Sequence, residues 1–418
     1  MVNFDINGIE TTLVKTDKFK TLTIFVAFLG EYSEKTATSK RLLSYLLNGS
    51  TKNYPSKKAI INKLFSLYDA AISVNTFPIY KTSVTVFSLH MVNPKYVKND
   101  EILREATTFF KEFIFNPNVD DEGFVENEFN EKKRIMRDGI NNIYNNKALY
   151  AYNRLFQEMG KGEIISVSSL GDLKQLEKIT RQSLYDDYKN MINDETVRIY
   201  VAGDITKEAV QSAFSDFPFN KNSFKLETTS FETKEINKVD EVFEIQNINQ
   251  AQLMMGFRTN VNALEELYIP MTVFNMMFGG MGSSDLFRVV REKNSLAYSI
   301  SSSIFFDTRV MVVAAGIDTK DYNLTTDLII KELENYKAGE IDEKLMKTAK
   351  ENLISSINQT VDNPHSNLNF IAKNTLLNNL MADEIIKKIH NVKIKDIQKA
   401  AQMIELDTIF CLKGNTND

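Results

Sequence analysis

The sequence predicts an α+β fold built from two homologous domains that arose by duplication. Its 418 residues exceed what one ordinary hydrophobic core organises, which favours more than one domain. A hydrophobic fraction of 43% with only 7 prolines indicates a globular chain rather than a disordered one. Strand-like and helix-like segments alternate, and their order in the first half recurs in the second.

The first half begins with an apolar strand and two helices, the first of which ends at a glycine. A pair of strands follows, and a polar turn then leads into a longer helix. The predicted elements are a strand over 22–28, a helix ending at 46–50, a helix over 60–68, a strand over 83–89, a turn at 93–96 and a helix over 102–113.

The second half repeats this order with similar spacing. Because order and spacing agree, we interpret the two halves as copies of one domain, each a sheet with helices packed on one face. The corresponding elements are a strand over 251–257, a helix ending at 278–280, a further helix and strand, a strand over 309–315, a turn at 318–322 and a helix over 324–336.

The two domains are predicted over residues 1–216 and 241–418. Residues 196–205 form the predicted last strand of the first domain, which ends in Gly-Asp-Ile. Residues 217–240 are charged, poor in aliphatic side chains and rich in Lys, Thr, Asn and Glu, a composition typical of a linker.

Composition and charge exclude several classes of function. The formal charge of −5 comes without a basic stripe carrying stacking aromatics, so we expect no nucleic-acid partner. The early apolar run at 22–29 is too short for an ordinary signal peptide, and nothing approaches the length of a membrane-spanning helix, so we expect no membrane partner. A single cysteine, Cys411, favours a reducing compartment. We therefore expect a cytoplasmic protein.

The most informative segment runs from Phe278 to Ser299 and begins with a glycine turn. Gly279 and Gly280 supply backbone freedom where a side chain would clash. Ser283 or its neighbour Ser284 is placed to cap the helix that follows. Leu286, Val289 and Val290 give that helix an apolar face.

After this helix, a strand is predicted whose two sides differ in character. Leu296, Tyr298, Ile300 and Ile304 fall on one side, and small or polar residues fall on the other. Arg291 and Tyr298 then lie near the junction of helix and strand, so we expect the guanidinium and the phenol to point into one space.

This segment resembles the C-terminal-domain signature of the pitrilysin/insulinase family of zinc peptidases, which runs roughly G-G-x-x-S-x-L-F-x-x-V-R-E-x-x-x-L-A-Y-S. The resemblance extends from about residue 22 to the C-terminal region. It implies the family's fold, two homologous domains that each contain an antiparallel-rich sheet. It also implies an exposed strand edge near residues 251–257 in the second domain. In relatives a strand edge near the zinc helix accepts the peptide as an added strand, and which edge does so in this chain stays open.

The resemblance also implies the roles of individual residues. Arg291 and Tyr298 are the implied catalytic pair: they bind the substrate backbone and stabilise the tetrahedral intermediate at a zinc site built by a different domain. Gly279, Gly280 and Ser283 are the implied substrate-binding residues of the glycine turn.

The zinc motif of active family members is absent from the sequence. That motif, H-x-x-E-H, places two histidines on one helical face as ligands and a glutamate that polarises the zinc-bound water. Aligned on the glycine turn at Gly49, the histidine positions hold Lys40 and Ser44, and the glutamate position holds Leu43. Asp138 falls near the third ligand. Since none of the three motif residues can serve, we expect no metal in this chain.

Other catalytic centres find little support in the sequence. The three histidines, His90, His365 and His390, are scattered singly without ligand spacing. Cys411 ends an apolar run and is expected to be a core residue rather than a nucleophile. A nucleotide-binding role for the glycine turn lacks the required strand–helix–strand context.

Arg291 and Tyr298 also fit an ordinary structural role. A cation near a helix end interacts favourably with the terminal carbonyls, and a strand tyrosine is often half buried. The dense match of the flanking residues to the family signature favours the functional interpretation.

An arginine and a tyrosine without a zinc motif imply a division of labour. The family includes two-subunit peptidases in which one chain holds zinc and the other, inactive alone, supplies this pair, around a chamber that admits short or unfolded peptides. The resemblance therefore implies a non-catalytic subunit of a heterodimeric zinc peptidase in a bacterial cytoplasm. Its partner would be a homologous zinc-binding peptidase subunit that carries the zinc, and its substrate a peptide.

Two alternatives remain open at this point. The chain could be a catalytically inert scaffold or peptide-binding protein of the same fold, in which Arg291 and Tyr298 are remnants. It could also be a stand-alone enzyme with unorthodox chemistry, for which the sequence offers neither a ligand set nor a triad.

Overall fold

The computed structural model describes residues 1–99, 101–221, 223–224 and 235–414, which fall into two compact units. The first unit comprises the described parts of Met1–Asn141, Val167–Thr228 and Asp362–Lys373, and the second those of Asn142–Ser166, Thr229–Val361 and Asn374–Asp418. Residues 225–234 of the predicted linker lie outside the described residues. The predicted domain boundaries at residues 216 and 241 stay a prediction.

The first unit is built on a six-stranded sheet. Its pairs are antiparallel except for the parallel pair β2–β8, and the apolar side chains Leu22, Ile24 and Val26 of the central strand β3 enter the core. In spatial order the strands are β1 (Val2–Ile6), β2 (Ile9–Lys15), β8 (Thr196–Gly203), β3 (Thr21–Glu31), β5 (Thr82–Val92) and β4 (Ala71–Ile79).

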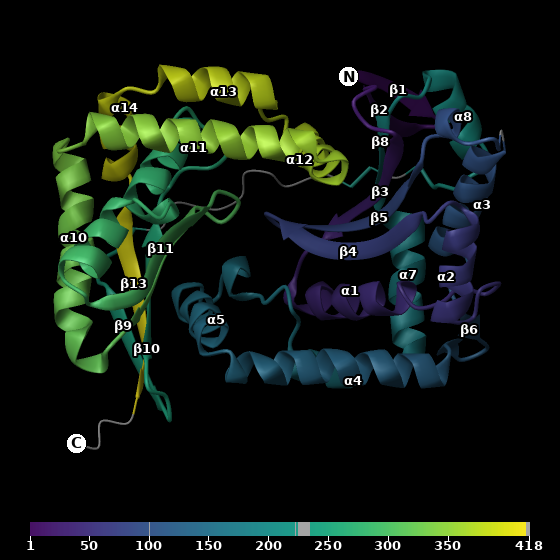
Figure 1. The fold of residues 1–418 in the computed structure, drawn as a ribbon. Helices are drawn as coiled ribbons and strands as arrows, with labels where there is room; N and C mark the ends of the chain where they lie inside the picture. The colour runs from purple at the N-terminus through teal and green to yellow at the C-terminus, as the bar shows by residue number, and fades with distance from the viewer. Residues whose placement is uncertain (100, 222, 225–234, 415–418) are drawn as a thin grey trace. The chain divides into compact units, whose positions relative to one another are not determined.

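Helices pack against this sheet and complete the core (Figure 1). The residues between β3 and β5 form the predicted helices, and the predicted helix after the polar turn is also confirmed. The helices of the first unit include α1 (Glu34–Leu47), α2 (Lys57–Ser66), α3 (Ile102–Phe115), α4 (Glu126–Asn142), α6 (Leu173–Lys178), α7 (Arg181–Asp194) and α8 (Lys207–Phe214).

Helix α1 is fixed at both ends by side chains. At its start, Ser33 and Thr36 form a capping box, in which each side chain bonds the other residue's backbone N–H. At its end, the Asn48 amide donates to the Val74 carbonyl of β4 at 2.7 Å and accepts from the Val74 N–H at 2.9 Å. The helix is therefore held in one position against the sheet.

The second unit is built on a five-stranded sheet in which β10 is central rather than at an edge. The prediction of an exposed edge at 251–257 is wrong, because the chain's last strand, β13, pairs with β10 on one side and β12 pairs with it on the other. In spatial order the strands are β11 (Ala297–Phe305), β12 (Val310–Ile317), β10 (Ala251–Arg258), β13 (Glu405–Gly414) and β9 (Asp240–Gln246).

The two sheets confirm the predicted duplication. In the first, the order β2-β8-β3-β5-β4 contains one parallel pair, β2–β8; in the second, the order β9-β13-β10-β12-β11 contains the corresponding parallel pair, β9–β13.

The helical segments of the second unit include α5 (Lys147–Met159), α9 (Tyr268–Asn275), η4 (Met276–Gly280), η5 (Phe287–Lys293), α10 (Tyr322–Ala338), α11 (Glu343–Asp362), α13 (Ala382–Asn391) and α14 (Ile394–Gln402); α12 (Pro364–Leu376) begins in the first unit.

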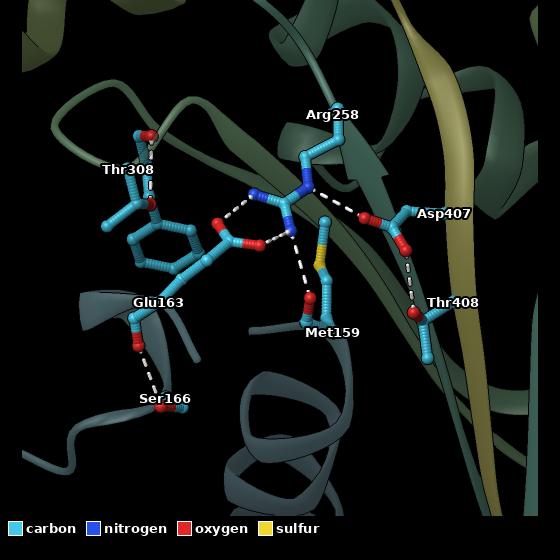
Figure 2. Close-up of polar contacts among 8 residues, drawn as sticks. Met159, Glu163, Ser166, Arg258, Thr308, Asp407 and Thr408 are labelled. Atoms are coloured by element: carbon cyan, nitrogen blue, oxygen red, sulfur yellow. Dashed lines mark hydrogen bonds and ion pairs between the residues drawn. The ribbon is translucent and has the colours of Figure 1, made fainter. Parts of the chain in front are cut away.

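A buried arginine attaches α5 and the turn after it to the second sheet (Figure 2). Arg258, at the end of β10, donates from Nε to Asp407 Oδ2 of β13 at 2.7 Å. Its two terminal nitrogens donate to the Glu163 carboxylate at 2.9 and 3.0 Å, and one also donates to the Met159 carbonyl at 2.9 Å. The side chain is only 5% exposed, and two carboxylates and a carbonyl accept four hydrogen bonds from this buried cation. It explains why residues 142–166 belong to this unit.

Candidate functional site

The three positions of the absent zinc motif lie on the buried side of α1. Leu43 is 1% exposed and belongs to the apolar core of the first unit. Ser44 is also buried, and its hydroxyl donates back to the Arg41 carbonyl at 2.8 Å. Neither side chain is therefore free to bind a ligand.

Lys40, at the position of the first histidine, forms a buried ion pair. Its Nζ lies 2.5 Å from Glu195 Oε1, and the two side chains are 8% and 13% exposed. Gly30 of β3 makes room for the carboxylate, since a Cβ there would lie 2.3 Å from Glu195 Oε1. Within the described residues the other oxygen, Oε2, is buried without a hydrogen-bond partner. Burial raises the pKa of Glu195, and the Lys40 charge opposes that rise.

The position suggested for a third zinc ligand does not contribute to this cluster. Asp138, on α4, is 55% exposed and lies 3.6 Å from Arg134 on the same helix. Across the part of the chain that the structure describes, no group of three or more His, Cys, Asp or Glu side chains is arranged to hold a metal ion. The residues at the motif positions thus do not fit zinc: an ammonium paired with a carboxylate occupies the place of a neutral ligand.

Arg291 lies on η5, a π-helical segment, and its side chain is exposed. The guanidinium carbon lies 4.7 Å from the centroid of the Phe287 ring, within the range of a cation–π contact. The sequence predicts a helix here but not its π form. Such segments are rare and frequently occur at functional sites.

Tyr298 is 77% exposed, which corrects its predicted place on the apolar side of the strand. The pairing of β11 with β12 shifts between Ala297 and Ser299, so one residue is inserted at Tyr298. Such a bulge reverses the alternation that a regular strand would keep. Ile300 therefore points inward while Tyr298 points to solvent.

The turn between η5 and β11 is closed by several hydrogen bonds. The Asn294 side-chain amide donates to the Val289 carbonyl at 2.8 Å. The Ser295 N–H donates to the Arg291 carbonyl at 3.1 Å, and the Leu296 N–H donates to the Val290 carbonyl at 3.0 Å. Ser295 has φ 54°, the left-handed conformation that usually requires glycine.

The glycine turn before η5 has a packing role that the structure makes explicit. A Cβ at Gly279 would lie 2.7 Å from the backbone nitrogen of Ser302 on β11, so only glycine allows this approach. At Gly280 a Cβ would lie 2.9 Å from the Asn275 carbonyl. Ser283 is exposed at the start of the next helix. A role of Gly279, Gly280 and Ser283 in substrate binding stays a prediction.

The start of the helix that carries Arg291 is anchored to α10. Asp285 is buried and accepts a hydrogen bond from the Tyr336 hydroxyl at 2.6 Å, and Arg288 pairs with the same carboxylate. Burial is the main cause that raises the pKa of Tyr336, so this phenol stays protonated and donating. Asp285 lies within the segment from Phe278 to Ser299, but nothing in that segment signals its partner on α10.

The three histidines and the cysteine lie on other elements of the chain. His90 Nδ1 is 2.9 Å from the Thr23 hydroxyl, and burial lowers its pKa. His365 packs edge-on against Phe25, and His390 is exposed on α13. Cys411 is buried within β13, where burial raises the pKa of its thiol to about 11. A buried thiol of high pKa is a poor nucleophile.

Comparison with known proteins decides the family. The family described as "Peptidase M16 inactive domain" matches residues 178–353. A probable inactive metalloprotease, YmfF of Bacillus subtilis (strain 168), is 28% identical over 97% of this chain and 96% of its own length. A crystal structure of a conserved protein from Enterococcus faecalis V583 is 31% identical, with a TM-score of 0.93 and coverage of 98% of this chain and 97% of that one.

The chain belongs to the M16 peptidases, the pitrilysin/insulinase family. The predicted resemblance is thus confirmed, and the chain is of the inactive type. The placement of Lys40, Leu43 and Ser44 at the zinc-motif positions stays a prediction. More distant solved structures share the fold, among them an M16 inactive domain from Pseudomonas fluorescens at 16% identity and a TM-score of 0.82, which covers 99% of this chain and 98% of that one.

Among the described residues, no helix combines the length and the apolar character needed to cross a bilayer.

Proposed function

We propose that this chain is the non-catalytic subunit of a two-chain zinc peptidase, and that it supplies Arg291 and Tyr298 to the zinc site of a homologous partner. One observation carries the proposal: a guanidinium and a phenol remain exposed on a closed turn, whereas the zinc-motif positions of the same chain are buried in a core. Groups kept at a surface without stabilising the fold are available to another molecule.

In this proposal the partner's zinc supplies the polarised water that attacks the peptide bond. Arg291 donates hydrogen bonds from its planar guanidinium to backbone carbonyls of the bound peptide and holds the peptide in register. The Tyr298 hydroxyl donates to the oxygen of the scissile carbonyl, on which negative charge develops. Both residues act as hydrogen-bond donors in this role.

The substrates would be short or unfolded peptides, because an extended backbone exposes the carbonyls that Arg291 can reach. A lone cysteine, Cys411, and the absence of a membrane-spanning helix in the described residues are compatible with the cytoplasm of a bacterium as the location.

A second candidate is an inert scaffold of the same fold. A structural neighbour is a chain in complex III2 from Candida albicans, at 14% identity and a TM-score of 0.73. That assembly shows this fold inside a large complex. Under this alternative, substitution of Tyr298 would leave every activity of the complex unchanged.

The experiment that separates the two candidates is affinity isolation of this chain from its native cytosol, with quantitative mass spectrometry of the proteins recovered. We expect one partner of similar size in equal amount, whose sequence contains H-x-x-E-H, and peptidase activity in the recovered pair. A chain recovered alone, or in a large complex without such a partner, would contradict the peptidase proposal.

A further inference from the structure

In the segment from Phe287 to Leu296, hydrogen bonds hold the backbone, and a separate contact with an aromatic ring holds the Arg291 guanidinium. Three hydrogen bonds close the backbone between Val289 and Leu296, and the Phe287 ring lies beneath the Arg291 guanidinium. Arg291 lies inside the closed loop, since its own carbonyl accepts from the Ser295 N–H.

The Asn294 contact has the separation of a π-helical turn. Its side-chain amide reaches the Val289 carbonyl, five residues earlier, as the backbone N–H does in a π-helix. Val289 is 8% exposed, so few water molecules can replace this donor. If the turn tightened to the i→i+4 pattern of an α-helix, the direction of Arg291 would rotate by tens of degrees.

Phe287 restricts the side chain of Arg291. An exposed arginine has many rotamers, and each bond that is fixed before substrate arrives is one less to fix on binding. A guanidinium that lies over a ring loses some of this freedom in advance.

We propose that Phe287 and Asn294 are positioning residues: Asn294 holds the wide last turn of η5, Phe287 holds the guanidinium, and together they direct Arg291 toward the peptide. The purpose of this arrangement rests on the function proposed above; the arrangement itself can be tested in the chain alone. Phe287 and Asn294 touch neither substrate nor zinc in this account and act only through Arg291.

The first test uses the isolated chain and the Arg291 Nε–Hε resonance, observed after arginine-selective ¹⁵N labelling. The Phe287 ring current should shift this resonance away from that of a free arginine. Phe287→Leu should remove the shift, Phe287→Tyr should keep it, and Asn294→Asp, which keeps the shape but loses the donor, should reduce it. Asn391→Ala, at the exposed end of α13, is the matched control and should leave it unchanged.

The second test uses the purified pair and an unstructured, quenched fluorescent peptide. We expect Phe287→Leu and Asn294→Asp to lower kcat/KM by about 10- to 100-fold, with a raised KM as well as a lowered kcat, because Arg291 both binds the peptide and holds it in position for reaction. Phe287→Tyr should restore kcat/KM. A purely structural role would instead lower the amount of folded chain and leave the kcat/KM of the folded fraction intact.

The outcomes separate this inference from the proposed function. If Tyr298→Phe lowers kcat but Phe287→Leu and Asn294→Asp leave kcat/KM unchanged, the positioning role is wrong and the proposed function stands. If Tyr298→Phe changes nothing, the proposed function is wrong, and the Arg291 resonance alone decides whether the guanidinium is held. A resonance that Phe287→Leu leaves unchanged would overturn the inference in either case.

Discussion

Two regions of this chain differ in exposure: the predicted zinc-motif positions on α1, and the turn and strand that carry Arg291 and Tyr298. On α1 the zinc-motif positions are buried, Leu43 in the apolar core and Lys40 against Glu195. At the junction of η5 and β11, Arg291 and Tyr298 remain exposed. On α1, an apolar core and a buried ion pair stand at the predicted positions of the metal site. A phenol that is 77% exposed contributes little to burial, so stability does not account for its place.

The largest expected effect tests whether the α1 region depends on its ion pair. Lys40→Met should lower the free energy of unfolding by about 3–5 kcal/mol, because it leaves the Glu195 carboxylate buried without its partner. The double variant with Glu195→Gln should recover most of this loss. Urea unfolding of the isolated chain measures both. A single variant as stable as the natural protein would mean that the pair is not buried in solution.

The next effect tests whether the glycine turn near Arg291 is held by packing. Gly279→Ala should lower the free energy of unfolding by about 1–3 kcal/mol, because its Cβ would lie 2.7 Å from the Ser302 nitrogen. Gly282→Ala is the matched control, since no atom lies within 4 Å of a Cβ there. Equal effects of the two substitutions would contradict the close approach of η4 to β11.

Stability should also depend on pH through Glu195. Its raised pKa means that the folded chain keeps this proton to a higher pH than the unfolded chain does. The resulting stabilisation is complete below the ordinary value of 4.5 and is lost as pH rises through the folded pKa. Lys40→Met should extend this loss to higher pH, because the Lys40 charge lowers the same pKa.

The contribution of Glu195 to the pH dependence of stability can be isolated by comparing the natural chain with Glu195→Gln. Burial also raises the pKa of Asp187, which lies near the same lysine, so the natural chain shows both groups together. Urea unfolding over a pH series should show a shallower decline above pH 4.5 for Glu195→Gln than for the natural chain. Identical pH profiles would show that Glu195 does not titrate as described.

The smallest effect concerns the strained residue between Arg291 and Tyr298. Ser295→Gly should raise the free energy of unfolding by at most about 1 kcal/mol, because relief of the left-handed strain is partly offset by the greater freedom of an unfolded glycine. Ser303→Gly, on exposed β11, should instead lower it slightly. Thermal unfolding measures whether stability rises in Ser295→Gly and falls in Ser303→Gly. A loss of stability in both variants would argue against strain at Ser295.

The sequence was sufficient to predict the repeat, the α1 region and the segment around Arg291. Local periodicity defines helices such as α3 and strands such as β5, and a dense signature defines the glycine turn. The pairing of β2 with β8 and of β9 with β13 was not predictable, since it joins segments far apart in the chain.

Two features of the site were also beyond sequence reasoning. The bulge at Tyr298 depends on how β11 registers with β12, whereas a sequence pattern assumes strict alternation. The partner of Lys40 comes from the end of α7, and neither residue alone signals the other. Periodicity predicts which face of a helix or strand is buried. Which polar groups meet depends on contacts between elements that are distant in the sequence.

The most direct test of the central claim is the kcat of the purified pair with Tyr298→Phe in this chain. The claim predicts a decrease of about 10²- to 10³-fold, the usual effect of losing one donor to a developing oxyanion. The pair should still form with unchanged affinity, and the folded chain should keep its stability, because Tyr298 is 77% exposed. A kcat equal to that of the natural pair would show that this chain does not take part in the chemistry and would favour the inert scaffold.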